Sequence, residues 1–126
     1  MEPLQVRPIG PPRDGVRVLA LSGELDYATE RTFVVMACQA LAEGCRRLIV
    51  ECSGLTFCDS EGLGGLLDVR LAAEQRDVLL VLAAISSPLR HVLALTDVLQ
   101  VFVVADTVEQ ALRVAGTAAG FGGPEL

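Results

Sequence analysis

A serine between two acidic residues, followed by glycines, is the segment whose residue types most clearly favour chemistry. Ser60 lies between Asp59 and Glu61. The residues that follow are small or apolar: Gly62, Leu63, Gly64 and Gly65. A serine hydroxyl can accept a phosphate, which would add about −1.5 to −2 charges beside the two carboxylates. The same residues also fit a structural role, in which Ser60 caps a helix and the glycines allow close packing. The segment alone leaves both interpretations open.

Strands and amphipathic helices alternate around this segment. Apolar periodicity and turn residues predict strands at 4–7, 16–22, 47–51, 78–83 and 101–104, and helices at 28–43, at 60–75, from 87 and from 106. A short turn joins the first two strands, so we expect them to be antiparallel, whereas helices bridge the later strands, which should be parallel. The predicted fold is α/β, a mixed sheet with about four helices packed on it. We expect residues 1–115 to form one domain and residues 116–126 to form a flexible tail.

The predicted helix beginning at Ser60 favours a phosphorylation switch on physical grounds. With Ser60 at the N-cap, its hydroxyl accepts from the first-turn N–H groups, and the helix N-terminus would partly stabilise a phosphate there. The glycines leave that turn bare, so that another protein's backbone could approach closely. A partner that fits two acids and a neutral hydroxyl would then be repelled by the phosphorylated form.

Three motifs carry a resemblance to a known family. The segment 59–64 resembles the D-S-x-G-L-G signature of STAS-domain anti-sigma factor antagonists, and 21–26 resembles the G-E-L-D segment of that family. Residues 85–89 are similar to its serine-proline entry to the third helix. The resemblance covers about residues 16–115. The fold that it implies is a STAS-like mixed sheet, first strand antiparallel and the rest mainly parallel.

The resemblance implies a specific regulatory function. In the family, the serine after the Asp is phosphorylated by a partner that is both kinase and anti-sigma factor, and this serine matches Ser60. The unphosphorylated antagonist binds the partner and so frees a sigma factor, and a phosphatase resets the phosphorylated form. The implied partner-binding residues surround Ser60: Asp26, Asp59, Ser60, Glu61, Gly62, Leu63 and Gly64. Glu61 departs from the small residue that many members carry, which could change the choice of kinase.

Two alternatives stay open beside this interpretation. Asp26 could simply cap the first helix instead of contributing to the partner surface. The whole chain could also be a constitutive STAS interaction module or a small-ligand-binding module that phosphorylation does not regulate.

Composition disfavours several other classes of protein. The formal net charge is −6, and the ten basic residues are all Arg without a cluster, which argues against nucleic-acid binding. The longest apolar run, 78–85, is far shorter than the roughly 20 residues of a membrane span. No secretory signal is visible, so we expect a cytoplasmic protein without a membrane partner.

The sequence lacks the motifs of the enzyme and receiver classes that use similar residues. A receiver domain requires a Lys, and this chain has none. The residues around Ser60 lack the first glycine of a G-x-S-x-G elbow, and Leu67 occupies the last position of a possible G-x-G-x-x-G. We therefore expect no enzyme activity, no catalytic residue and no cofactor.

The cysteines and the single histidine do not form a recognisable site. Cys38, Cys45, Cys52 and Cys58 are spaced by seven, seven and six residues, which matches no usual zinc pattern. We expect structural thiols and no metal, with a redox role for Cys58 as the minor alternative. His91 lies on a predicted helix and is expected at or near the surface.

Overall fold

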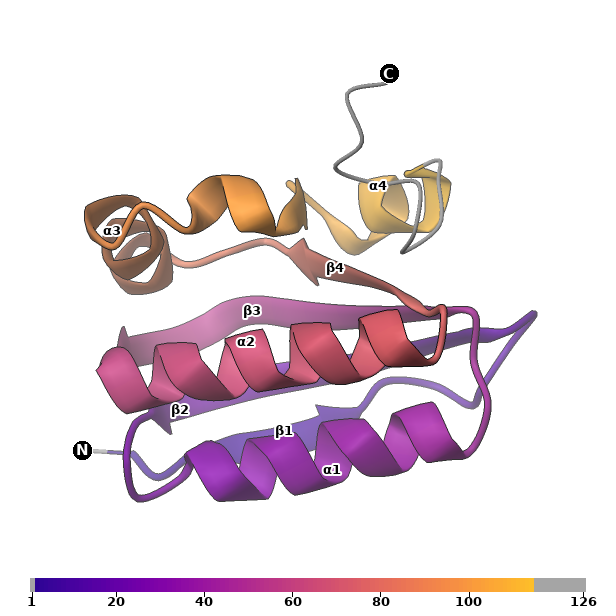
Figure 1. Cartoon of the computed structure of the whole chain (residues 1–126), viewed down its shortest axis with the longest axis horizontal. Helices are drawn as coiled ribbons and strands as arrows, with labels where there is room; N and C mark the ends of the chain where they lie inside the picture. The colour runs from indigo at the N-terminus through magenta and orange to yellow at the C-terminus, as the bar shows by residue number, and fades with distance from the viewer. Residues whose placement is uncertain (1, 115–126) are drawn as a thin grey trace.

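The computed structural model describes residues 2–114 and shows one sheet with helices on both faces (Figure 1). The elements are β1 (Gln5–Pro8), β2 (Val16–Leu25), α1 (Glu30–Ala42), β3 (Arg47–Cys58), α2 (Ser60–Gln75), β4 (Leu79–Ala83), α3 (Ser87–Leu95), the 3-10 turn η1 (Leu99–Val101), β5 (Val103–Ala105) and α4 (Val108–Arg113). The tail expected at 116–126 lies outside the described residues. None of the helices within 2–114 has both the length and the apolar character that crossing a membrane requires.

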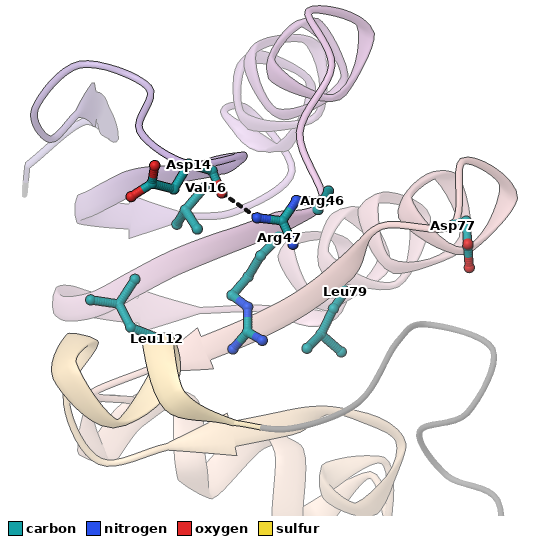
Figure 2. Close-up of a pocket in the computed structure, with 7 residues that line it drawn as sticks. All are labelled: Asp14, Val16, Arg46, Arg47, Asp77, Leu79 and Leu112. Atoms are coloured by element: carbon teal, nitrogen blue, oxygen red, sulfur yellow. Dashed lines mark hydrogen bonds between the residues drawn. The ribbon is translucent and has the colours of Figure 1, made fainter.

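The five strands lie in the order β1-β2-β3-β4-β5. β1 pairs with β2 in antiparallel fashion, and every later pair is parallel, which confirms the predicted mixed sheet. The carboxyl ends of β2, β3 and β4 meet at one edge, which we call the carboxyl edge, and α1, α2 and α3 begin there. The amino ends of the same strands meet at the opposite, amino edge, near Arg46 and Arg47 (Figure 2).

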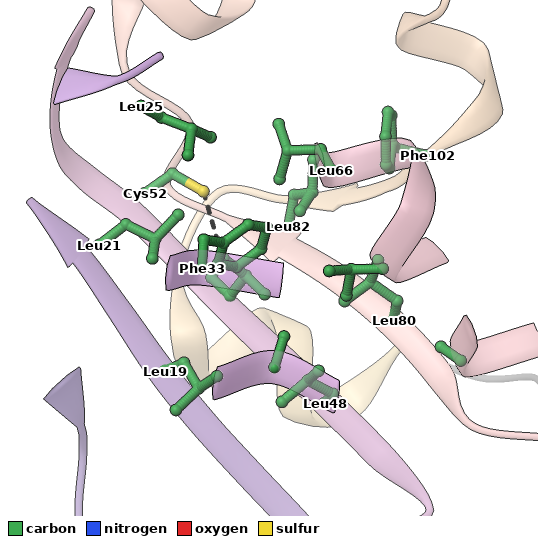
Figure 3. Close-up of a cluster of buried hydrophobic side chains, with 14 of the residues drawn as sticks. Leu19, Leu21, Leu25, Phe33, Leu48, Cys52, Leu66, Leu80, Leu82 and Phe102 are labelled. Carbon is green, nitrogen blue, oxygen red and sulfur yellow. Dashed lines mark hydrogen bonds between the residues drawn. The ribbon is translucent and has the colours of Figure 1, made fainter. Parts of the chain in front are cut away.

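The larger of two apolar cores lies between the sheet and helices α1, α2 and α3. Phe33 of α1 is fully buried at its centre and is surrounded by leucines of the strands and of α2 (Figure 3). Apolar spacing predicts a stripe of Phe33, Met36, Ala37, Ala40 and Leu41 in this helix. Four of these five residues are buried, and Met36 is half-buried. Burying one large apolar side chain contributes roughly 1.5–3 kcal/mol to stability. This core therefore holds α1 and α2, the helix that begins at Ser60, against the sheet.

The smaller core lies on the other face, where α4 covers Ile49, Val81 and Ala83 through Ala111. Leu112 of the same helix is 47% exposed, and Leu71 of α2 is 52% exposed. The apolar spacing of their helices predicts that both leucines face inward, and the structure shows that this prediction is wrong.

Strands β2 and β3 are longer than the sequence predicted. The sequence predicts that this strand ends at residue 51 and that residues 53–55 form a turn. Both predictions are wrong, because β3 continues beside β2 as far as Cys58 with two register shifts. Gly54, which resembled a turn residue, lies in this irregular region, where an added Cβ would be 2.9 Å from Leu21 O. Glycine at a bulge permits such close backbone approach. The longer strand carries the chain directly to Asp59.

The entry to α3 and the last strand also differ slightly from the prediction. The serine-proline pair predicts Ser87 as the N-cap of this helix, but the N-cap of α3 is Ser86, and Pro88 lies inside the first turn. Proline is tolerated there because first-turn N–H groups have no acceptor within the helix. The last strand begins at Val103, since residues 99–101 form η1.

Candidate functional site

Ser60 is the first residue of α2 and lies exposed at the carboxyl edge. Its hydroxyl donates a hydrogen bond to Glu61 Oε1 at 3.2 Å, and Glu61 is also exposed. A hydroxyl in this position is accessible to another protein. Among residues 2–114, the hydrogen-bond partner of this hydroxyl is the exposed Glu61 and not a buried group.

The N-cap of α2 is Asp59, which corrects the prediction that Ser60 caps the helix. Asp59 has extended backbone angles (φ −99°, ψ −174°), and its Oδ1 accepts a hydrogen bond from the Gly62 N–H at 2.8 Å. Asp and Ser are about equally good N-caps, and the aspartate one residue earlier takes the position here. The Ser60 hydroxyl is therefore free of the structural role that was the main alternative to phosphorylation.

Asp59 also ties the β2–α1 loop to the start of α2. Its second carboxylate oxygen, Oδ2, accepts a hydrogen bond from the Tyr27 backbone N–H at 3.1 Å. The Asp59 N–H in turn donates to Leu25 O at 3.3 Å. One carboxylate thus fixes the loop that carries Asp26 and Tyr27 next to Ser60.

Asp26 shapes that loop and does not occupy the N-cap of α1, which is Thr29. The Asp26 Oδ1 accepts hydrogen bonds from the Ala28 N–H at 3.0 Å and from the Thr29 hydroxyl at 3.1 Å. Asp26 is half-buried, so part of its side chain remains accessible at the carboxyl edge. The sequence left open that Asp26 caps the first helix. Its structural role is instead to stabilise this local turn.

The glycines of α2 have three different surroundings, so the first turn is not uniformly bare as expected. An added Cβ at Gly62 would lie 2.3 Å from Leu25 O, and one at Gly65 would lie 3.3 Å from the Glu30 side chain. A Cβ at Gly64 would meet no atom within 4 Å. Gly62 and Gly65 therefore allow α2 to pack against β2 and α1, and only Gly64 leaves open space on the outer side.

The structure thus separates the predicted partner-binding residues into two groups. Gly62 is buried and Leu63 is 6% exposed, within the larger core. The residues with accessible surface at the carboxyl edge are Asp26, Asp59, Ser60, Glu61 and Gly64.

Two exposed aromatic residues near this edge were not identified from the sequence. Tyr27 is 76% exposed in the β2–α1 loop, and Phe57 is 46% exposed on β3, two residues before Asp59. Exposed aromatic side chains are enriched at protein interfaces. For Tyr27, the sequence did contain a signal of exposure. This aromatic residue lies outside every predicted apolar stripe, so no place in the core accounts for it.

Acidic residues from three elements gather at the carboxyl edge: Glu24, Asp26, Glu30, Asp59 and Glu61. Within residues 2–114, the ion pairs are Arg17–Glu43 and Arg70–Glu74, so none of these five acids is paired there. The edge therefore presents negative charge that a basic surface of another protein would complement.

Comparison with models of known protein families identifies the family of this chain. The model of the STAS domain matches residues 10–111. The chain belongs to the STAS domain family. Its match includes both halves of the site, the β2–α1 loop and the start of α2.

Solved STAS-like structures share the fold. An anti-sigma factor antagonist from Mycobacterium paratuberculosis is 22% identical, with a TM-score of 0.72 over 87% of this chain and 92% of that chain. A sulfate transporter family protein from Wolinella succinogenes is 18% identical, with a TM-score of 0.70 over 80% and 84%. The Bacillus cell fate determinant SpoIIAA in its phosphorylated form is 22% identical, with a TM-score of 0.65 over 87% and 96%.

The two buried cysteines of this STAS domain are poor candidates for redox chemistry. Burial raises the pKa of the Cys58 thiol from the ordinary 9.0 to about 12, and the adjacent Asp59 carboxylate adds to this effect. Burial likewise raises the pKa of Cys52. The thiolate is the reactive form, and both thiols stay protonated at neutral pH.

Alkylation of the native STAS domain should therefore spare Cys52 and Cys58. At about pH 8, iodoacetamide should label at most Cys38 and Cys45, which are half-buried, while denaturant should expose all four free thiols. Intact mass and peptide mapping measure this directly. Rapid labelling of Cys58 in the native protein would restore its candidacy as a redox site.

Proposed function

We propose that this STAS domain is an anti-sigma factor antagonist that binds an anti-sigma factor kinase until Ser60 is phosphorylated. The observation that carries the proposal is that Asp59, and not Ser60, caps α2. Asp59 caps α2, so the exposed Ser60 hydroxyl can be modified without removing a bond that the fold needs. The similar structures include anti-sigma factor antagonists, among them SpoIIAA, which is known in an unphosphorylated and a phosphorylated form, and they support the same assignment.

The proposed switch is electrostatic. In the unmodified state, a basic partner surface meets the acidic carboxyl edge and a neutral hydroxyl. During phosphorylation, the Ser60 Oγ forms a bond to the γ-phosphorus of kinase-bound ATP, ADP leaves, and a base of the kinase takes the proton. The product adds about −1.5 to −2 charges next to Glu61 and Asp59. A surface shaped around the hydroxyl is then excluded by the size and charge of the phosphate.

The site residues divide between contact and support in this proposal. Asp26, Asp59, Ser60, Glu61 and Gly64 form the accessible contact surface, while Gly62 and Leu63 position it from below. The chain itself acts by binding and not as an enzyme. Binding occupies the anti-sigma factor and frees a sigma factor, and a phosphatase resets the switch. These partners are cytoplasmic proteins, so the proposal places the chain in the cytoplasm.

A constitutive interaction module is the second candidate function. The structural similarity to a sulfate transporter family protein favours it, because that similarity extends over 80% of the chain. The two candidates differ in one requirement: only the switch needs phosphate on Ser60.

Incubation with the cognate anti-sigma factor kinase and ATP-Mg should add one phosphate, on Ser60. The kinase can be identified among proteins that co-purify with the chain, and intact mass with peptide mapping locates the phosphate. Ser60→Ala provides the matched control and should remain unmodified. Phosphate on Ser53, Ser86 or Ser87 with Ser60 unmodified would contradict the assignment.

Asp26→Asn should weaken partner binding while leaving the melting temperature nearly unchanged. The asparagine Oδ1 can still accept from the Ala28 N–H and the Thr29 hydroxyl, so the local turn survives and only the charge is lost. Calorimetric titration with the anti-sigma factor, with thermal melts alongside, measures both quantities. Unchanged affinity would assign Asp26 to the turn alone.

A further inference from the structure

A hollow of about 480 Å³ lies at the amino edge of the sheet, opposite the Ser60 site (Figure 2). Its walls come from the starts of β2, β3 and β4 and from α4. The lining residues are Asp14, Val16, Arg46, Arg47, Asp77, Leu79 and Leu112. The volume is in the range of small-molecule sites, roughly 300–1,000 Å³. The anti-sigma factor proposal uses none of these residues.

Each arginine of the hollow donates a hydrogen bond to a backbone carbonyl. Arg46 Nη2 donates a hydrogen bond to Asp14 O, and its guanidinium packs so closely over Gly15 that an added Cβ there would lie 2.6 Å from Arg46 Nε. Arg47 is half-buried and donates through Nη1 to Ala111 O of α4. Guanidinium groups already fixed in this way lose less conformational entropy when a ligand binds.

Neither guanidinium forms an ion pair with a carboxylate among residues 2–114. No ion pair within 4.0 Å involves Arg46 or Arg47 there, although Asp14 and Asp77 also line the hollow. Each guanidinium has five N–H donors, and its bond to a carbonyl leaves others free. The hollow therefore offers free guanidinium donors from two consecutive residues, beside two carboxylates that form an ion pair with neither of them.

Beside the two arginines and the two aspartates, three apolar residues complete the wall of the hollow. Val16 is half-buried, Leu79 is 3% exposed and Leu112 is 47% exposed. The exposed leucine has no core role, and its side chain borders the arginines. A ligand that pairs with the guanidinium groups would at the same time cover this apolar surface.

We propose that the hollow binds a small organic anion with a phosphate or carboxylate head and an apolar body. The head pairs with Arg46 and Arg47, since guanidinium groups match the geometry of both anions. The apolar body packs on Val16, Leu79 and Leu112. This site is separate from Ser60, so it can exist whether or not the chain is an anti-sigma factor antagonist.

Nitrogen-15 NMR titrations with four probes test the site on the unmodified protein. Phenyl phosphate and benzoate present the two heads with an apolar ring, inorganic phosphate has no ring, and phenol has no full charge. We expect saturable shifts of the amides at 14–16, 46–47, 77–79 and 112 with at least one ring-bearing anion. Its affinity should exceed those of inorganic phosphate and phenol by about tenfold, and the tighter ring-bearing anion identifies the preferred head.

Two variants on different walls separate this site from non-specific binding. Arg46→Gln removes one charge at an exposed position, and Leu112→Ala removes exposed apolar surface, so both should fold. Each should weaken binding by roughly threefold to tenfold, whereas Arg90→Gln, an exposed arginine of α3, should have no effect. The proposal is overturned by a lack of saturable shifts, by shifts centred on the carboxyl edge, or by equal affinity in all variants.

Discussion

Replacing Gly62 by alanine should destabilise the domain by roughly 1–3 kcal/mol or more. The added Cβ would lie 2.3 Å from Leu25 O and 2.9 Å from Leu25 C, which are backbone atoms at the end of β2. Neither atom can move away as a flexible side chain could, so α2 must shift away from the sheet. That shift would also disturb the hydrogen bond from Gly62 to the Asp59 cap. Urea or thermal unfolding measures the loss.

Gly64→Ala is the matched control, two residues further along the same helix. Its Cβ meets no atom within 4 Å, so the general preference for alanine over glycine in a helix should stabilise the domain by about 0.5–1 kcal/mol. The added methyl should weaken partner binding if Gly64 belongs to the contact surface. A Gly62→Ala protein as stable as wild type would contradict the close packing between α2 and β2.

Ser60→Ala should bind the anti-sigma factor whether or not ATP is present, and Ser60→Asp should bind it about tenfold or more weakly. Alanine cannot accept phosphate, so the dissociated state is unreachable. Aspartate places three acids in a row at positions 59–61 and imitates about half of the phosphate charge. Calorimetric titration of both variants, with and without ATP-Mg, measures the two affinities.

Differences in folding stability should not affect the comparison of these two affinities, because Asp59 and not Ser60 caps α2. Both variants should unfold within about 0.5 kcal/mol of wild type, as surface substitutions usually do. The aspartate should gain slightly from its position at the helix N-terminus. Wild-type affinity in Ser60→Asp would show that charge at this turn is not the switch, and would favour the constitutive module.

The fold and the position of Ser60 could be predicted because their signals are local. The apolar stripe around Phe33 and the glycine-rich start of α2 follow from spacing alone. The N-cap could not be assigned in this way, because Asp59 and Ser60 are adjacent and both residue types suit the position. The backbone at Asp59 is extended because β3 ends directly before it, and this conformation makes Asp59 and not Ser60 the N-cap.

The remaining errors came from tertiary contacts that leave no periodic signal. Gly54 is a residue type that favours turns, but here it lies close to the Leu21 backbone and β3 continues past it. Gly62 and Gly64 are alike in the sequence, yet one lies against β2 and the other faces open space. The Tyr27 backbone N–H likewise donates a hydrogen bond to Asp59, 32 residues away along the chain, and the sequence pattern does not indicate this contact.

Comparing the wild-type protein before and after phosphorylation is the most direct test of the proposed switch. Both forms, verified by intact mass, are titrated calorimetrically with the same anti-sigma factor preparation in a nucleotide state that permits no turnover. The account predicts tight binding of the unmodified form and a loss of about tenfold or more when Ser60 carries phosphate. Equal affinity of the two forms would contradict it.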